Sequence, residues 1–174
     1  DRSMVAGRFA QAICREQRVS PDIADKAFLG ALLQDIGMLV IATREAEHYS
    51  AVLQEAAALN QPLYAIEKLR LGVNHMEVGA YMLGLWNLSP EVVEAVLYHS
   101  NPNATTSEKF TPLTAVHLAD SILPDVVNIN ECRICSRISQ KYLTRLGLQN
   151  NLSRWQQMSE EFASQLYSGV GRGF

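Results

Sequence analysis

Apolar residues recur with a helical period along this chain, and no segment shows the alternation of a half-buried strand. Three hydroxyl–proline pairs mark helix starts, at Ser20-Pro21, Ser89-Pro90 and Thr111-Pro112. The hydroxyl can cap a free N–H group there, and proline has no N–H to leave unpaired. The sequence therefore predicts an all-α fold of about eight or nine helices. The expected helices span residues 2–17, 21–44, 46–59, 62–70, 75–86, 90–100, 112–123, 131–146 and 153–168.

The composition fits one packed domain over residues 1–174, because 48% of the residues are hydrophobic and only 19% are charged. A formal net charge of −3 leaves no cationic field for a nucleic-acid partner. The longest apolar runs, such as 37–42, are too short to cross a membrane, so no membrane partner is expected. There is no signal-peptide pattern, and three cysteines, an odd number, fit the reducing cytoplasm. The cytoplasm is therefore the predicted location.

The two ends of the chain carry different signals. Residues 1–18 already look helical, and no capping lead-in precedes Met4. We therefore expect the chain to be part of a longer protein that has a further N-terminal portion. The glycine-rich residues 169–174 are expected to fray.

A few polar residues lie near helix ends or on otherwise apolar helix faces. Mixtures of histidine and carboxylate form iron, manganese and magnesium sites, and a two-metal centre activates water for phosphoester hydrolysis. The residues lie on different predicted helices, so only the tertiary fold can bring them together. These residues are Asp35, His75, His99, His117 and Asp120.

Four segments in series resemble the HDOD family, the HD-related output domain of bacterial signalling proteins. They are 27–40 (AFLGALLQDIGMLV), 72–83 (GVNHMEVGAYML), 86–99 (WNLSPEVVEAVLYH) and 116–120 (VHLAD). Their order and spacing match the family over about residues 1–125. The resemblance implies a single HD-superfamily helical domain. It also implies that an N-terminal helical subdomain precedes this region.

Catalytic relatives in that superfamily, including the HD-GYP phosphodiesterases, hold metal with a histidine, a His-Asp pair, further histidines and a final aspartate. Here Gln34 replaces the histidine of the pair, and its neutral amide is a poor metal ligand. Ser100 replaces the second histidine of a Tyr-His-His motif, and Arg2, which would repel a cation, falls near the first histidine position. The resemblance thus implies a degenerate site without catalytic residues.

The matching residues form the expected vestigial pocket, for which no cofactor is predicted. A divalent metal or iron is the alternative, with both aspartates and both histidines as the weaker metal candidates. Each of these residues also has a structural interpretation, as a hydrogen-bonded buried carboxylate or as an imidazole at a helix end. We expect His117 to have a structural role and His48 to lie on the surface. The pocket residues are Gln34, Asp35, His75, His99 and Asp120.

Cys132 and Cys135 form a CxxC pair, the spacing of zinc and dithiol sites. Tetrahedral zinc needs two further ligands, and Cys14 is distant in the sequence, so the pair is expected to fill core. The predicted helix 131–146 also carries a basic stripe, expected to be a solvated face, although it can also dock an acidic partner. The stripe is Arg133, Arg137, Lys141 and Arg145.

Three functions are compatible with these residues. The preferred hypothesis, which the resemblance implies, is a non-catalytic signal-transduction module, the output part of a bacterial response regulator in a two-component system. It would act by conformational change and by binding a protein partner or a neighbouring signalling domain. The first alternative is a metal-dependent phosphohydrolase with an altered ligand set. The second alternative is a metal or redox sensor that uses Cys132 and Cys135.

Overall fold

The computed structural model describes residues 2–123 and 136–170, with side chains as far as 163. The prediction of an all-α fold is confirmed, since the described residues form α-helices and two short 3-10 turns, η1 and η2. The elements are α1 (Arg2–Glu16), α2 (Pro21–Leu33), α3 (Ile36–Arg44), α4 (Ala46–Leu59), α5 (Leu63–Leu71), α6 (His75–Leu85), α7 (Pro90–Tyr98), η1 (Pro102–Ala104), α8 (Pro112–Ile122), α9 (Gln140–Arg145), η2 (Gln149–Asn151) and α10 (Leu152–Val170).

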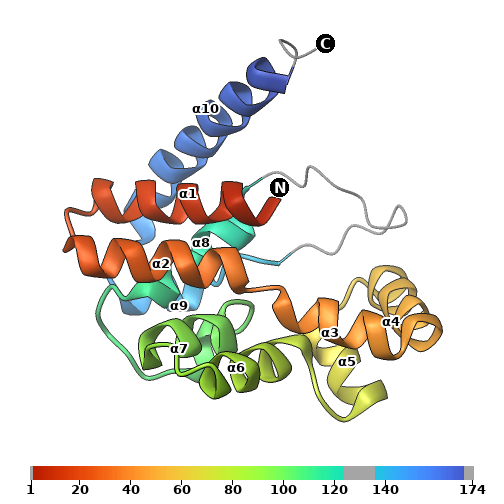
Figure 1. Ribbon diagram of the computed structural model, residues 1–174. Coiled ribbons are helices and arrows are strands. Elements are labelled where there is room, and N and C mark those ends of the chain that lie inside the picture. Colours follow the sequence, from red (N-terminus) through yellow and green to blue (C-terminus); the bar gives the residue numbers. More distant parts are fainter. Residues whose placement is uncertain (1, 124–135, 171–174) are drawn as a thin grey trace.

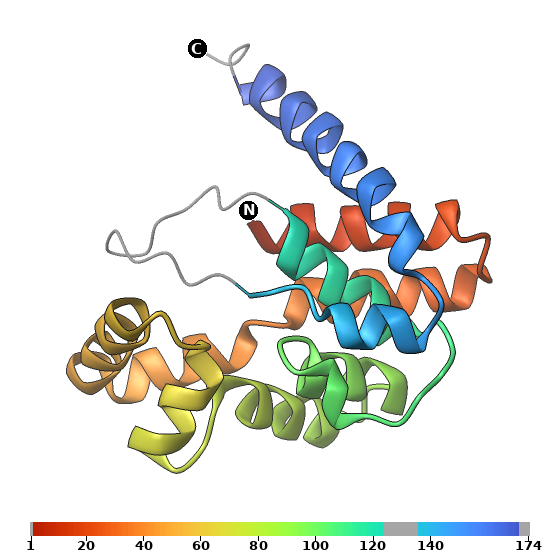
Figure 2. The same ribbon diagram turned by 180° about the vertical axis from the view of Figure 1, so that it is seen from behind.

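The helices form a body and a lobe (Figures 1 and 2). In the body, α1 and α2 run antiparallel side by side and pack on α8, while α6 and α7 form a second layer. The lobe consists of α3, α4 and α5 and lies at one end of the body. Helix α10 projects away from the body at the opposite side from α6 and α7.

Three groups of buried apolar side chains hold this arrangement together. The main core lies among α1, α2, α8, α9 and the start of α10, and includes Phe9, Leu113 and Trp155. A second cluster, around Tyr49 and Ile66, fills the interior of the lobe. A third, smaller cluster joins α6 and α7 to the end of α2. The lobe therefore has its own core, and its position depends on the residues at its junction with the body.

The single helix predicted over 21–44 is wrong at its centre, because the chain breaks into α2 and α3 at Gln34 and Asp35. Gln34 is fully buried, and its side-chain amide donates to Asp120 Oδ1 at 2.8 Å. Asp35 has φ −97° and ψ 9°, which turns the chain toward the lobe. The observed helices exceed the predicted set by one because of this break.

The helix predicted over 131–146 is also wrong in its described part, since α9 begins only at Gln140. The Ser139 amide donates to His117 Nε2 at 3.0 Å, and its hydroxyl accepts from Tyr142 N at 3.2 Å. Ser139 therefore caps the helix, and its amide is already paired outside it. Residues 131–135 lie outside the described part of the chain.

The basic stripe is consequently not one helix face. Arg137 precedes α9 and donates to the carbonyl and side-chain oxygens of Asn60, at 3.1 and 2.6 Å, where α4 ends. Arg145 lies over the Tyr142 ring, with the guanidinium carbon 5.2 Å from the ring centroid. Arg137 thus contacts the lobe and Arg145 the body, and Arg133 lies outside the described residues.

From the sequence, residues 169–174 are expected to fray, and the apolar runs are expected to be too short to cross a membrane. Helix α10 continues to Val170, so residues 169 and 170 are helical, and 171–174 lie outside the described part. The stretch Pro21–Arg44 is long and apolar enough to cross a membrane by length and composition. In the structure this stretch is two helices, and α2 packs against α1, α7 and α8.

Helix α3 meets α6 at a close backbone contact that requires glycine. A Cβ added to Gly37 would lie 2.0 Å from the His75 carbonyl oxygen and 2.8 Å from the Gly79 nitrogen. We expect Gly37→Ala to destabilise the fold by about 3 kcal/mol or more in urea unfolding, because backbone atoms must move apart. Gly84→Ala is the control, since no atom lies within 4 Å of its added Cβ. It should stabilise α6 by about 0.5–1 kcal/mol. Equal stability of Gly37→Ala and wild type would contradict the contact.

Candidate functional site

An arginine joins the two aspartates that the sequence singles out. Arg2, the first residue of α1, places Nη1 3.3 Å from Asp35 Oδ2 and Nη2 3.2 Å from Asp120 Oδ1. Asp120 Oδ1 also accepts the Gln34 amide at 2.8 Å. The Arg2 guanidinium thus bridges the two carboxylates and places one positive charge between them.

The charge on Asp120 is retained although the residue lies in the interior. Burial raises the pKa of the Asp120 carboxyl, but the His99 imidazole and the positive charge of Arg2 act against it. Hydrogen bonds from Ser136 and Arg2 add to this effect, so that the pKa lies below its ordinary value. Asp120 is therefore an anion that is held by donors from α1 and from the end of α2.

His75 lies in the first turn of α6, and the Glu67 carboxylate holds its ring. Asn74 and Glu77 form a capping box, with Glu77 N donating to Asn74 Oδ1 at 2.9 Å and Asn74 N donating to Glu77 Oε2 at 3.1 Å. The His75 ring is buried, and its Nδ1 lies 2.5 Å from Glu67 Oε2. The second oxygen of Glu67 accepts the Tyr49 hydroxyl at 2.6 Å. A buried chain Tyr49–Glu67–His75 thus connects α4 and α5 to α6.

The members of this chain shift one another's proton affinity. Burial lowers the pKa of His75, but the hydrogen bond and charge of Glu67, with Asp35 and Asp120, raise it above its ordinary value. Burial raises the pKa of Glu67, yet its bonds to His75 and Tyr49 hold it below the ordinary value. Glu67 is therefore the anionic partner of a buried ion pair at acidic to neutral pH.

His99 follows α7 and is kept neutral. Its Nδ1 lies 2.8 Å from the Val96 carbonyl oxygen, which can only accept, so Nδ1 carries the proton. Burial lowers the pKa of His99, the Asp120 charge partly offsets this, and the His75 charge lowers it further. The Nε2 atom of His99 therefore presents a lone pair.

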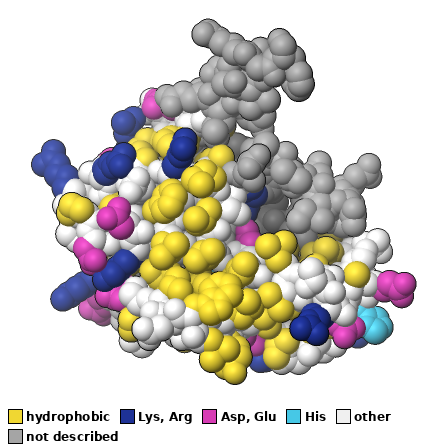
Figure 3. Space-filling model, viewed as in Figure 1, with side chains coloured by type: hydrophobic (Ala, Val, Ile, Leu, Met, Phe, Trp, Pro, Cys, Tyr) yellow, Lys and Arg dark blue, Asp and Glu magenta, His cyan; other side chains and the backbone are white. Residues whose placement is uncertain are grey.

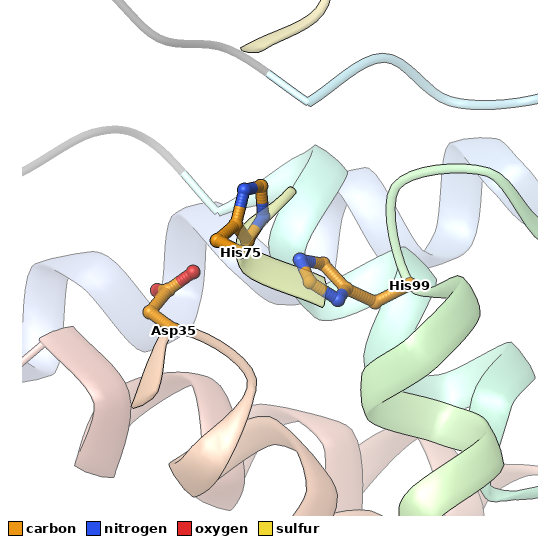
Figure 4. Close-up of side chains that lie close together, drawn as sticks. All are labelled: Asp35, His75 and His99. Carbon is orange, nitrogen blue, oxygen red and sulfur yellow. The ribbon is translucent and has the colours of Figure 1, made fainter. Parts of the chain in front are cut away.

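The structure brings three of the predicted residues to one point (Figure 4). Asp35, His75 and His99 each offer one ligand atom, and these atoms all lie within 4.8 Å of one another. The His75 and His99 ring centroids are 5.4 Å apart. The site thus has two halves, which we name the arginine half (Arg2, Gln34, Asp120) and the histidine half (Asp35, His75, His99). The arginine half contains its own cation, whereas the histidine half has the donor set of a metal site.

The other histidines and Ser100 do not join either half. His117 is buried, its Nδ1 donates to the His99 carbonyl oxygen at 2.6 Å, and its Nε2 accepts from Ser139, so both ring nitrogens are used. The Ser100 hydroxyl lies 3.2 Å from the Ser136 hydroxyl. His48 is exposed beside Glu45, as the sequence predicts. His117 thus serves to join α8 to the chain around it.

Of the three cysteines, Cys14 is the one that the structure describes. Cys14 is buried in the main core, and burial raises the pKa of its thiol to about 12. A thiol in that state is unreactive at neutral pH. Cys132 and Cys135 lie outside the described part of the chain.

Sequence reasoning missed Glu67 and Tyr49, which support the site from the lobe. A signal for each is present in the sequence. Glu67 falls on the apolar face defined by Leu63 and Ile66, and Tyr49 shares a face with Val52. A carboxylate at such a position has to find a partner when the face is buried. The pattern indicates burial, but it does not identify His75 as the partner.

A model of the HDOD domain family matches residues 1–102, which is more than half of the sequence, and the chain belongs to this family. The resemblance stated from the four motifs is therefore confirmed. An uncharacterized protein of Treponema pallidum (strain Nichols) is 29% identical over 108 residues, covering 62% of this chain and 20% of that protein.

Two solved structures share the fold at 18% identity. An HDOD domain protein of unknown function from Geobacter sulfurreducens gives a TM-score of 0.68, covering 96% of this chain and 58% of that one. A candidate phosphohydrolase from Shewanella amazonensis gives 0.60, covering 95% and 62%. The chain thus spans only about a fifth of its curated relative and about three-fifths of the solved chains.

The buried pair predicts a pH-dependent effect of Glu67→Gln. Because the folded pKa of Glu67 is low, its contribution to stability is present above the reference value of 4.5 and is lost as pH falls. Because the folded pKa of His75 is high, its contribution is present below 6.5 and is lost as pH rises through the folded value. The free energy of unfolding, measured with urea in the presence of a chelator, should therefore be lower in Glu67→Gln than in the wild type. The difference should be largest, about 3 kcal/mol, between these two pH values.

Glu55→Gln is the matched control for this measurement. Glu55 also pairs across α4 and α5, with Arg70 Nη2 at 2.6 Å from Oε1, but this pair is on the surface. Its replacement should change stability much less than replacement of Glu67. A flat difference between Glu67→Gln and wild type from pH 4 to 8 would contradict the buried ion pair.

Proposed function

We propose that this chain is a non-catalytic signal-transduction module of the HDOD type, which acts by conformational change and partner binding. We further propose that it is the output part of a bacterial response regulator. The observation that carries the first proposal is the Arg2 bridge between Asp35 and Asp120. A two-metal hydrolytic centre needs free carboxylates to bind metal and so lower the pKa of water, and a guanidinium cannot do this.

The position of the polar residues supports a conformational role. The arginine half joins α1, the α2–α3 junction and α8, and the histidine half joins that same junction to α6 and α7. The Tyr49–Glu67–His75 chain continues the connection into the lobe. An input that shifts one of these helices changes the partners of buried charges, which is a costly change that favours discrete states over gradual ones.

An exposed apolar face supports binding of a protein partner or a neighbouring signalling domain. Figure 3 shows apolar side chains gathered along α2 and on toward α3 and α6. Leu39 on α3 and Tyr81 and Leu85 on α6 are 63%, 69% and 68% exposed. Large exposed apolar patches of this kind are typical of surfaces that other proteins cover.

The competing proposal is a metal-dependent phosphohydrolase, favoured by the histidine half and by the name of the Shewanella amazonensis neighbour. We expect no turnover of bis(p-nitrophenyl) phosphate, nucleotides or cyclic dinucleotides with Mg²⁺, Mn²⁺ or Fe²⁺, beyond that of Asp35→Ala. Turnover by the wild type that Asp35→Ala abolishes would overturn the non-catalytic proposal.

The conformational part is tested by amide hydrogen exchange on Arg2→Ala. Loss of both ion pairs should speed exchange in α8 and at the start of α3 by roughly ten-fold. Arg8→Ala is the control, because Arg8 is exposed on the same helix, and it should leave both regions unchanged. Faster exchange confined to the first turn of α1 would show that Arg2 does not couple the helices.

A further inference from the structure

Two buried imidazoles each use one ring nitrogen, Nδ1, in a contact that fixes the ring. His75 and His99 are only 3% and 1% exposed, and Nδ1 of each is engaged by Glu67 and by the Val96 carbonyl. Among the described residues, no hydrogen bond reaches Nε2 of either ring. Nε2 is therefore the ring nitrogen of each histidine that is available to a ligand.

The side chains of the two histidines and of one aspartate converge (Figure 4). One ligand atom each from Asp35, His75 and His99 lie within 4.8 Å of one another. Atoms bound tetrahedrally to one ion at about 2.0–2.2 Å are roughly 3.3–3.6 Å apart, so a contraction of at most about 1.5 Å completes the geometry. Arg2 contacts Asp35 through the Oδ2 atom of its carboxylate, at 3.3 Å.

The supporting contacts are those of metal-binding histidines. Such histidines donate their second ring N–H to a carboxylate or a backbone carbonyl, which fixes the ring and raises its basicity. Glu67 has this role for His75, and the Tyr49 hydroxyl in turn holds Glu67. The Val96 carbonyl has the same role for His99. Both Nε2 atoms are thereby held in fixed orientations.

The charge of the site favours a dication. Asp35, Asp120 and Glu67 carry three negative charges, and Arg2 supplies one positive charge. When an ion replaces the Nε2 proton of the charged His75, both imidazoles are neutral, and two negative charges remain for the ion to balance. One divalent ion balances them.

We propose that Asp35, His75 and His99 bind a single divalent first-row transition ion of the Zn²⁺ or Fe²⁺ kind. Two imidazoles and one carboxylate suit these ions, whereas Mg²⁺ and Ca²⁺ need more oxygen ligands. The arginine half restricts the site to one ion. A bound ion would connect the α2–α3 junction to α6 and α7, and so fix the lobe on the body. The inference goes beyond the proposed function and stands without it.

The test uses the full chain with Cys132→Ser and Cys135→Ser, so that thiolates do not contribute. After chelator dialysis, Zn²⁺ alone should bind at one equivalent and raise Tm by about 5–10 °C at one hundred times Kd. Co²⁺ should give visible absorption bands of a nitrogen-ligated site. Absence of binding, or binding that requires the two cysteines, would overturn the proposal.

Variants locate the ion. His75→Gln, His99→Gln and Asp35→Asn should each weaken binding at least ten-fold, and Glu67→Gln by about 10–100-fold. Asp35→Asn covers the case in which a buried variant misfolds, because Asp35 is partly exposed, at 32% for its side chain. His48→Gln, at an exposed histidine, is the control and should bind as wild type does. Undiminished binding by folded His99→Gln and Asp35→Asn would refute the site. Metal-dependent phosphodiester turnover would overturn the proposed function but leave the metal site standing.

Discussion

The fold depends on how two aspartates are neutralised where the helices meet. Asp120 lies on a helix that is buried over most of its length, and Asp35 lies at the joint between body and lobe. Arg2 spans both carboxylates from the first turn of α1, and the Gln34 amide adds a donor. Without these donors, a buried carboxylate would carry a desolvation cost of several kcal/mol. The break between α2 and α3 exists where this contact is made.

The separation into two halves changes how the lost histidines are interpreted. Counted along the chain, Arg2, Gln34 and Ser100 are three losses from one metal centre. In space, Arg2 and Gln34 both lie in the arginine half, where they replace a cation and its ligand with a guanidinium and an amide. The histidine half keeps a complete set of three donors with their supporting contacts. Loss of two-metal catalysis is therefore compatible with retention of a single-ion site.

Local sequence patterns predicted the helices well where the capping bonds form within the helix's own first turn. The capping box at Asn74 and the cap at Ser20 form as the residue types indicate. The predictions failed at Gln34 and Ser139, where a side chain or an amide bonds to a distant helix. Helical period is a local property, and a partner that is distant in sequence overrides it. The partnership of Glu67 with His75 escaped prediction for the same reason.

The sequence by itself determined the all-α class, the family and most of the polar residues at the centre, because helix period, caps and motif spacing are local. Only the tertiary structure decided which of those residues meet. Spacing along a helix indicates which face a side chain occupies, but not which helix lies opposite that face. The glycine contact between α3 and α6 brings Asp35 close to His75, and the end of α7 adds His99. The pairing of Arg2 with two carboxylates likewise depends on the packing of α1 against α2 and α8.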